Sequence, residues 1–461
     1  MLHRKIEREI ENWLSDDPRG RGEKNKRSTD KALLINGVRQ AGKTYIIRQC
    51  LKSSACPWVE FNLIAQPDLV PLIDGARDVD DLILKLSLYS EEALIPGKTV
   101  IFFDEIQKCR EIVTKIKFLV EDGRFRYILS GSLLGVEMVN LRSAPVGYLK
   151  ILPLYPLDFE EFLQVFHISS EILDLLRESY QRKQPVDTVL HQKLMDIFSL
   201  YLIIGGMPAA VETYRTTENI DAVMAEHQAI MDLYQLDFTQ YEEDKRKLFI
   251  RQIYNQIPAA LNQKNKRFKL ADLQKNLRFD RVEDSFTWLW KAGVVLGVFN
   301  VTEPKIPLLL NTKHNLFKVF LSDVGLLTTR YGKNCKLKIM THDRDLNQGA
   351  IYENAVAQEL HAHGIDLYYY NSKKRGELDF VLEHEGQVLP LEVKSGKDYL
   401  RHSALSQIMK EEAYGIPEAV VLTQDNVQVK GKITYLPIYM TMFLGEDPQD
   451  FVDLSVGRFA L

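Results

Sequence analysis

Residues 32–44 read ALLINGVRQAGKT, a short apolar stretch followed by a glycine-rich loop that ends in Lys43 and Thr44. Residues 37–44 match the pattern G-x-x-x-x-G-K-[ST], and the following TYIIRQCL can open a helix. A strand, such a loop and a helix in this order cradle phosphate groups, because the loop amides and the helix N-terminus face the negative charge. The stretch therefore predicts an α/β fold with a P-loop that binds a nucleoside triphosphate.

The residue types in this loop predict individual roles. Lys43 is expected to reach the β- and γ-phosphates, and the Thr44 hydroxyl to bind Mg²⁺. The loop pattern alone also occurs by chance in glycine-rich turns, so its strand and helix context matters. The expected nucleotide contacts are Gly37, Val38, Arg39, Gln40, Ala41, Gly42, Lys43, Thr44 and Tyr45.

A second feature supports the nucleotide site. Residues 100–105 (VIFFDE) form an apolar run that ends in two acids, and ligand-binding groups of parallel sheets lie at such strand ends. We expect Asp104 to hold Mg²⁺ and Glu105 to act as the base that polarises the attacking water. The run FRYILSGS (125–132) ends in hydroxyls, and Ser130 is expected between the acids and the γ-phosphate. A serine turn that only caps the strand is the alternative.

Composition limits the class of protein. Of 461 residues, 45% are hydrophobic and 26% charged, which is typical of soluble globular chains, and the length implies two to four domains. The net charge of −4 offers nucleic acid no overall attraction, so any such binding needs a local patch. The four cysteines form no C-x-x-C pair, and no apolar run approaches the ~20 residues that span a bilayer. We expect a cytoplasmic protein without membrane contact.

The pattern of elements divides the chain into five segments. The runs LLIN, WVEFNL, TVIFFDE and FRYILSGS alternate with amphipathic stretches, which predicts a mainly parallel sheet with helices on its faces. Residues 205–208 (GGMP) predict a tight turn, with Pro208 opening a helix. The expected segments are an N-terminal helix and linker (1–30), an ATPase core (31–155), a helical lid (156–264), a winged helix (265–340) and a C-terminal α/β domain (345–461).

The winged helix is expected from two short helices followed by a β-ribbon, VVLGVFNV (294–301) and PLLLN (307–311). At the start of this segment, residues 262–278 carry six basic side chains and one acid. A basic face there could contact the phosphates of DNA or RNA. A solvated face, or an adapter without nucleic acid, remains the alternative. The residues expected to make such contacts are Lys264, Lys266, Arg267 and Lys269.

The C-terminal segment carries a second set of charged residues. Glu392 and Lys394 alternate on one expected strand and therefore share a face, while Asp379 lies on the preceding strand and Glu353 on a helix. This arrangement resembles the PD-(D/E)xK restriction-endonuclease-like fold. The resemblance implies Mg²⁺ bound by Glu353, Asp379 and Glu392, with Lys394 acting on the attacking water. A cross-strand ion pair on a solvated hairpin is the alternative.

The order of motifs resembles one family. GVRQAGKTY, FFDEIQ, LSGS, LYPLDFEEFL (154–163) and GGMP are similar to the AAA-type P-loop ATPases with a C-terminal domain of unknown function 4143. The resemblance covers nearly the whole chain and implies an ATPase of the AAA+ kind. Where many members carry an arginine shortly before YPL, this chain has Gly147 and Tyr148. Arg142 is the candidate arginine finger, acting within a homo-oligomer, and an ordinary surface arginine is the alternative.

The expected function is therefore ATP binding and hydrolysis with Mg²⁺, coupled to a C-terminal nuclease-like domain that processes nucleic acid. The alternative is an ATP-gated switch whose C-terminal domain is catalytically inactive and docks a protein partner.

Overall fold

The computed structural model describes residues 2–15, 31–132, 147–240, 244–343, 346–396 and 398–445. The chain forms two compact units, each built from separated stretches of sequence. The first unit contains residues 1–168, 199–297 and 319–346, and the second contains residues 169–198, 298–318 and 347–461. The finer division into five segments stays a prediction.

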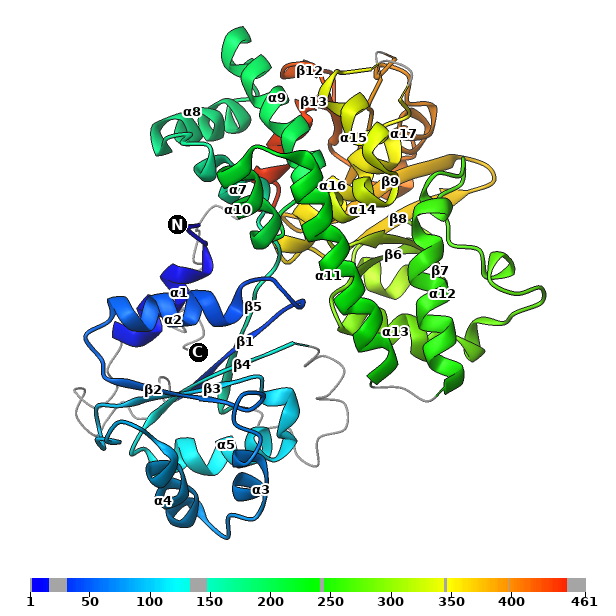
Figure 1. The fold of residues 1–461 in the computed structure, drawn as a ribbon. Coiled ribbons are helices and arrows are strands. Elements are labelled where there is room, and N and C mark those ends of the chain that lie inside the picture. Colours follow the sequence, from blue (N-terminus) through cyan, green and yellow to red (C-terminus); the bar gives the residue numbers. More distant parts are fainter. Residues whose placement is uncertain are drawn as a thin grey trace, which may run out of the picture. The chain divides into compact units, whose positions relative to one another are not determined.

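The first unit is built on a five-stranded parallel sheet with the order β2-β3-β4-β1-β5. All four strands expected for this region are confirmed. They are short and largely apolar because buried parallel strands meet helices on both faces. Helices α1 and α2 lie on one face of the sheet, and α3, α4 and α5 cover the other (Figure 1). The strands are β1 (Ala32–Asn36), β2 (Trp58–Asn62), β3 (Val100–Asp104), β4 (Arg126–Gly131) and β5 (Leu149–Pro153).

The helices of this unit follow the expected pattern. Gly205 has a φ of 72°, which lets the chain turn sharply before Pro208 opens α10. The core helices are α1 (Ile6–Ser15), α2 (Lys43–Ser53), α3 (Leu69–Asp74), α4 (Val79–Tyr89), α5 (Arg110–Asp122) and α7 (Phe159–Val165). Six helices follow: α10 (Pro208–Thr217), α11 (Ile220–Gln240), α12 (Asp244–Leu261), α13 (Glu283–Lys291), α14 (Val324–Arg330) and α15 (Lys333–Met340).

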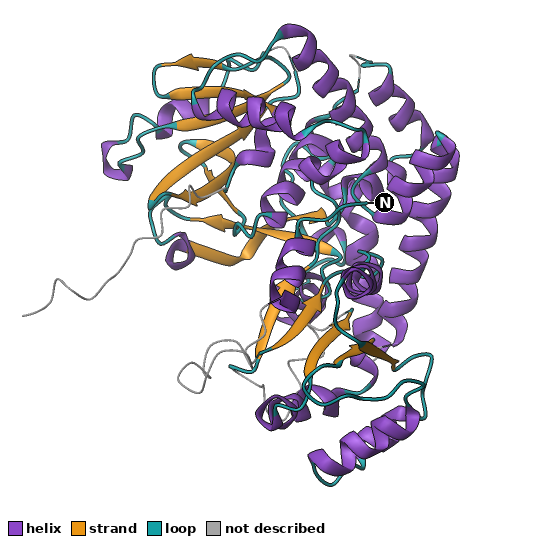
Figure 2. Ribbon diagram, turned by 90° about the vertical axis from the view of Figure 1, so that its left-hand side faces the viewer, coloured by secondary structure: helices purple, strands orange, loops and turns teal. Residues whose placement is uncertain are grey.

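The second unit is built on strands of a mixed eight-stranded sheet with the order β12-β13-β11-β10-β9-β8-β6-β7. Strands β9 and β10 form an antiparallel hairpin in which Leu391 faces Phe380. Figure 2 shows the strands in orange and the helices in purple. The strands are β6 (Val295–Val301), β7 (Thr312–Leu321), β8 (Tyr368–Ser372), β9 (Gly376–His384), β10 (Gln387–Val393), β11 (Ala419–Thr423), β12 (Gln428–Lys430) and β13 (Ile433–Pro437). The helices are α8 (Ser170–Gln181), α16 (Gly349–Ala362) and α17 (Ser403–Ile408), while α9 (Thr188–Ile204) belongs partly to each unit.

One expected strand is wrong. Residues Leu308–Asn311 form a short 3₁₀ helix after Pro307, and the strand β7 starts only at Thr312. Leu309 and Leu310 are 62% and 79% exposed, so this apolar run is not a core strand. No single described helix is long and apolar enough to cross a membrane, although the bent pair α9 and α10 has the combined length and composition.

Candidate functional site

The P-loop connects β1 to α2, as the sequence predicts. Gly37 lies so close to the backbone after strand β5 that an added Cβ would approach the Leu154 carbonyl oxygen to 2.1 Å. Gly42 and Gln40 have φ values of 91° and 67°, so the loop turns through the left-handed region twice. These constraints fix the loop backbone at the N-terminus of α2, where amides face an anion.

Lys43 is buried at the base of this loop. Its Nζ donates to the carbonyl oxygens of Gly37 and Val38, at 3.0 and 2.9 Å. Burial lowers the pKa of Lys43 to about 8, although Glu105 and Asp104 act in the opposite direction. The ammonium group is thus held beside the position expected for phosphates.

Asp104 is the centre of the polar network at the strand ends. The Thr44 hydroxyl lies 3.0 Å from its Oδ2, and the Asn62 amide donates to the same oxygen at 2.9 Å. The Ser130 hydroxyl donates to Oδ1. Burial raises the pKa of Asp104, while the Ser130 and Thr44 hydrogen bonds oppose that shift. A hydroxyl and a carboxylate side by side are oxygen ligands of the kind that Mg²⁺ prefers, so the residues fit this ion.

Glu105 follows with a backbone that is unusual for a residue other than glycine. Its φ of 59° lies in the left-handed region, a conformation that is concentrated at functional sites. The Gln107 amide donates to the Glu105 carboxylate and also to Ser132 Oγ, at 3.3 Å. The structure therefore brings the expected metal ligand, the expected base and the lysine to one edge of the sheet. The candidate finger Arg142 lies outside the described residues.

A pocket of about 510 Å³ adjoins the P-loop within the first unit. This volume lies in the usual range for small-molecule sites, and the lining is mainly apolar. The lining residues are Leu2, Arg4, Gly42, Tyr45, Ile46, Pro208, Ala209 and Glu212. A flat, largely apolar ligand group attached to a phosphate chain would fit there.

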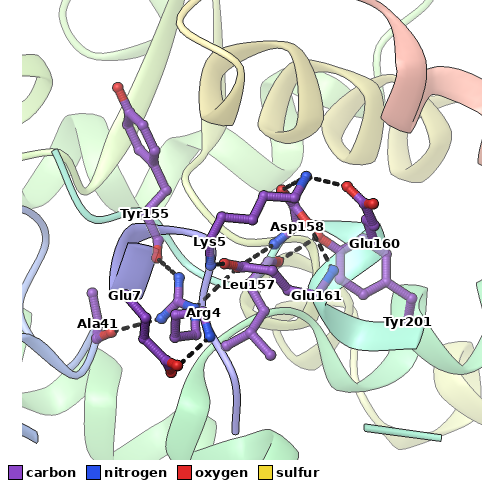
Figure 3. Close-up of polar contacts among 10 residues, drawn as sticks. All are labelled: Arg4, Lys5, Glu7, Ala41, Tyr155, Leu157, Asp158, Glu160, Glu161 and Tyr201. Carbon is purple, nitrogen blue, oxygen red and sulfur yellow. Dashed lines mark hydrogen bonds and ion pairs between the residues drawn. The ribbon is translucent and has the colours of Figure 1, made fainter. Parts of the chain in front are cut away.

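The N-terminal segment is tied to the P-loop through Arg4 (Figure 3). The guanidinium donates to the Ala41 carbonyl oxygen at 3.2 Å, to the Tyr155 carbonyl oxygen at 2.7 Å and to Glu161 Oε2 at 3.0 Å. Lys5 adds ion pairs to Asp158, at 2.8 Å, and to Glu160, at 2.5 Å. One buried arginine thus links the loop backbone to the start of α7.

A second contact joins the P-loop to helix α11. Arg39 pairs with Asp237, and the Tyr234 hydroxyl donates to the Arg39 carbonyl oxygen at 3.3 Å. Burial raises the pKa of Asp237, and Arg39 counteracts the shift. Arg39, the third residue of the P-loop, is therefore joined to helix α11 by an ion pair.

The C-terminal charged residues also come together, within the second unit. Lys394 Nζ lies 2.6 Å from Glu392 Oε1, as expected for residues on one face of a strand. Asp379 Oδ2 accepts a hydrogen bond from the Val393 amide at 2.9 Å. Burial raises the pKa of Glu392 to about 8, and the nearby Asp379 adds to this effect. The expected site residues are neighbours.

A lysine that was not expected lies among them. Lys318, on β7, is fully buried, and its Nζ lies 2.7 Å from Glu377 Oε1, 3.7 Å from Glu353 Oε2 and 3.9 Å from Asp379 Oδ1. Burial alone would lower the pKa of Lys318, but the three carboxylates outweigh it and hold the pKa above its ordinary value. In the described residues, Glu353, Asp379 and Glu392 do not bring their ligand atoms within 4.8 Å of one another. In this arrangement they do not fit a Mg²⁺ ion.

Family models match both the region that contains the P-loop and the C-terminal region. An AAA domain model matches residues 29–163, and the domain of unknown function DUF4143 matches residues 348–441. The chain therefore contains an AAA domain and a C-terminal DUF4143 domain. Between the two, the domain of unknown function DUF8612 matches residues 195–336 of the AAA-type protein. No curated protein matches the sequence.

Solved structures resemble the AAA-type protein only distantly. A Walker-type ATPase of Pyrococcus abyssi is 15% identical with a TM-score of 0.42, covering 72% of this chain and 96% of its own. Orc1 of Aeropyrum pernix, solved in complex with DNA, is 14% identical with a TM-score of 0.31 and coverages of 74% and 93%. RuvB of Thermotoga maritima is 16% identical with a TM-score of 0.28 and coverages of 66% and 89%. At these values the likeness carries no argument about function.

Several contacts of the AAA-type protein were not expected from its sequence. Asn62 could have been found, because it ends strand β2 at the same sheet edge as Asp104. Gln107 lies two residues after Glu105 and offered a weaker signal. Arg4, Asp237 and Lys318 reach their sites from distant parts of the sequence, and no local pattern marks them.

Proposed function

We propose that the first unit of this AAA-type protein binds ATP with Mg²⁺ and hydrolyses it. The observation that carries the proposal is the network around Asp104, which joins Thr44 and Ser130 beside Lys43 and Glu105. A P-loop threonine and a strand-end acid supply the metal ligands in such ATPases, and the adjoining acid supplies the base.

We assign a separate role to each side chain of the site. The Lys43 ammonium exchanges its two loop carbonyls for phosphate oxygens, and the Glu105 carboxylate accepts a proton from the attacking water. Bound Mg²⁺ would be held by Thr44 and Asp104 and would polarise the phosphoryl oxygens. Ser130 orients Asp104 through its hydrogen bond. Arg142, from a neighbouring copy in a homo-oligomer, would neutralise charge that develops on the transferred group.

We propose that the base of the nucleotide enters the pocket beside the P-loop. Its mainly apolar lining includes Tyr45 and Ile46 at the start of α2 and Pro208 at the start of α10. A base that enters this pocket would contact both the P-loop helix and the turn at 205–208. Nucleotide binding would therefore affect the position of helix α10, which begins at this turn.

The direct test is nucleotide binding to a Lys43→Ala protein. Loss of charged hydrogen bonds worth about 1.5–3 kcal/mol should weaken ATP binding roughly 10- to 100-fold. Lys52→Ala, an exposed position near the end of the same helix, is the matched control and should bind as the wild type does. Equal affinity of the Lys43 variant and the wild type, measured by titration calorimetry, would count against the site.

For the DUF4143 domain we propose the role of an effector that docks a partner without cutting nucleic acid. The observation that favours this role over a metal-dependent nuclease is Lys318, whose ammonium lies among the carboxylates expected to bind Mg²⁺. The whole chain would then act as an ATP-gated switch. Mg²⁺ binding by Glu353, Asp379 and Glu392, with Lys394 acting on water, stays a prediction of the sequence.

A further inference from the structure

The ion pair between Arg39 of the P-loop and Asp237 of α11 lies beside the charged groups of the nucleotide site. The Arg39 side chain is 36% exposed, whereas Asp237 is only 2% exposed. Burial lowers the pKa of Lys43, and the charge of Arg39 acts in the same direction, so the two cations are close enough to repel each other. The Asp237 carboxylate therefore supplies an anion at a point where the loop places two positive charges.

Asp237 also lies within electrostatic reach of the residues that follow strand β3. Burial raises the pKa of Asp237, and Arg39 and Lys108 oppose this shift, whereas the proposed base Glu105 adds to it. The ion pair is thus close both to the base and to the P-loop lysine, the two groups that act on the γ-phosphate in such ATPases. Arginine forms bidentate hydrogen bonds with carboxylates and phosphates alike, so the two anions compete for one guanidinium.

The ion pair is connected to further helices of the first unit. The Tyr234 hydroxyl, also on α11, donates to the Arg39 carbonyl oxygen at 3.3 Å. Phe238 directly follows the acid of the ion pair, and its ring centre lies 5.3 Å from that of Tyr254 on α12 and 5.5 Å from that of Trp288 on α13. A change of partner at Arg39 would therefore act on the part of α11 that packs against both helices.

We propose that Arg39 distinguishes ATP from ADP by binding the γ-phosphate, and that Asp237 holds the same guanidinium until the γ-phosphate displaces it. The ion pair then opposes the binding of ATP and leaves the binding of ADP unaffected, because ADP has no group that competes for Arg39. The inference rests on the nucleotide site proposed above. It adds which residue recognises the terminal phosphate and which helix loses an ion pair when that phosphate binds.

The test is titration calorimetry of the full chain with Mg²⁺ and either ADP or the β,γ-imido analogue of ATP. In Asp237→Asn the guanidinium has no charged acid to leave, so the preference for the analogue over ADP should rise at least about threefold. Arg39→Met with Asp237→Asn should lose this gain, because the group that binds the γ-phosphate is gone. Asp232→Asn, the same substitution at an exposed position of the same helix, is the matched control and should leave the preference unchanged.

Two results would overturn the inference and leave the nucleotide site in place. One is an Asp237→Asn protein whose preference for the analogue is unchanged or lower, and the other is a gain that persists in the double variant. A wild type that binds neither nucleotide would contradict the proposed function and this inference with it. Both deciding variants remove the buried acid, so neither leaves a buried carboxylate without its arginine. If Asp237→Asn does not fold, Asp237→Ser replaces it in both arms of the test.

Discussion

Asp104 receives hydrogen bonds from side chains on three other elements, namely Thr44 on α2, Asn62 on β2 and Ser130 on β4. Each of these partners lies at a carboxyl end of a strand or at the start of the P-loop helix. Chemistry and sheet topology together therefore predict most of the site. The role of Arg4 is not predicted in this way, because it depends on where the N-terminal segment packs.

At the residue scale, Arg4→Met should be strongly destabilising. The substitution removes hydrogen bonds to two carbonyl oxygens and leaves the buried Glu161 carboxylate without its guanidinium partner. Breaking a buried ion pair from one side costs about 3–5 kcal/mol, so the melting temperature should fall by several degrees. Arg8→Met, at an exposed position of α1, is the control and should melt close to the wild type. Equal melting of the two variants would contradict the assigned role of Arg4.

At the element scale, the turn at 205–208 is supported by buried polar groups that lie far away in the sequence. Asp323 Oδ2 accepts from the Gly206 amide at 2.6 Å, and His227 Nε2 lies 2.9 Å from the Ile204 carbonyl oxygen. Lys336 Nζ lies 3.0 Å from Thr328 Oγ1 in the same region. The sequence predicts the turn from its glycines and proline. It does not predict these supports, because long-range partners leave no local pattern.

His227 makes this support dependent on pH. Burial, together with the nearby Lys336, lowers the pKa of His227 to about 3. Between about pH 6.5 and 3 the unfolded chain therefore binds a proton that the folded chain does not, so stability falls as the pH falls. From pH 7.5 to 5.5 the wild type should lose roughly 1–1.5 kcal/mol more than His227→Gln.

The measurement is urea unfolding of both proteins at the two pH values. His314→Gln, at an exposed position of β7, is the matched control. A stability difference between wild type and His227→Gln that does not change with pH would show that His227 is not held neutral by its surroundings.

At the scale of the whole molecule, the sequence predicts the first sheet well and the second unit less completely. Strands β1, β3 and β4 are short apolar runs with a polar residue at or near their carboxyl ends, a pattern typical of buried parallel strands. Strand β5 was not expected, because its residues are partly or fully exposed at the sheet edge. The pairing of β6 with β8 joins residues about 70 positions apart, which periodicity does not reveal.

Whether the whole molecule binds nucleic acid is tested at the basic side chains of residues 264–269. Lys264 and Lys269 are exposed, and Lys266 and Arg267 are half-buried. If these four side chains contact phosphates, affinity for duplex DNA should fall with salt, with a log–log slope of about −0.9 per contact. Replacing all four with glutamine should flatten the slope, as fluorescence anisotropy over a salt series would record. An unchanged slope would show that these four side chains do not contact the phosphates, and no measurable binding at low salt would favour a protein partner.

The central claim is that this AAA-type protein hydrolyses ATP with Glu105 as the base. The most direct measurement is phosphate release from Mg²⁺-ATP by wild type and by Glu105→Gln, with nucleotide binding measured in parallel. Glutamine cannot accept the proton of the attacking water, whereas Thr44, Lys43 and Asp104 remain, so the variant should bind ATP as the wild type does and lose at least about 100-fold in turnover. Hydrolysis by Glu105→Gln at the wild-type rate would contradict the account.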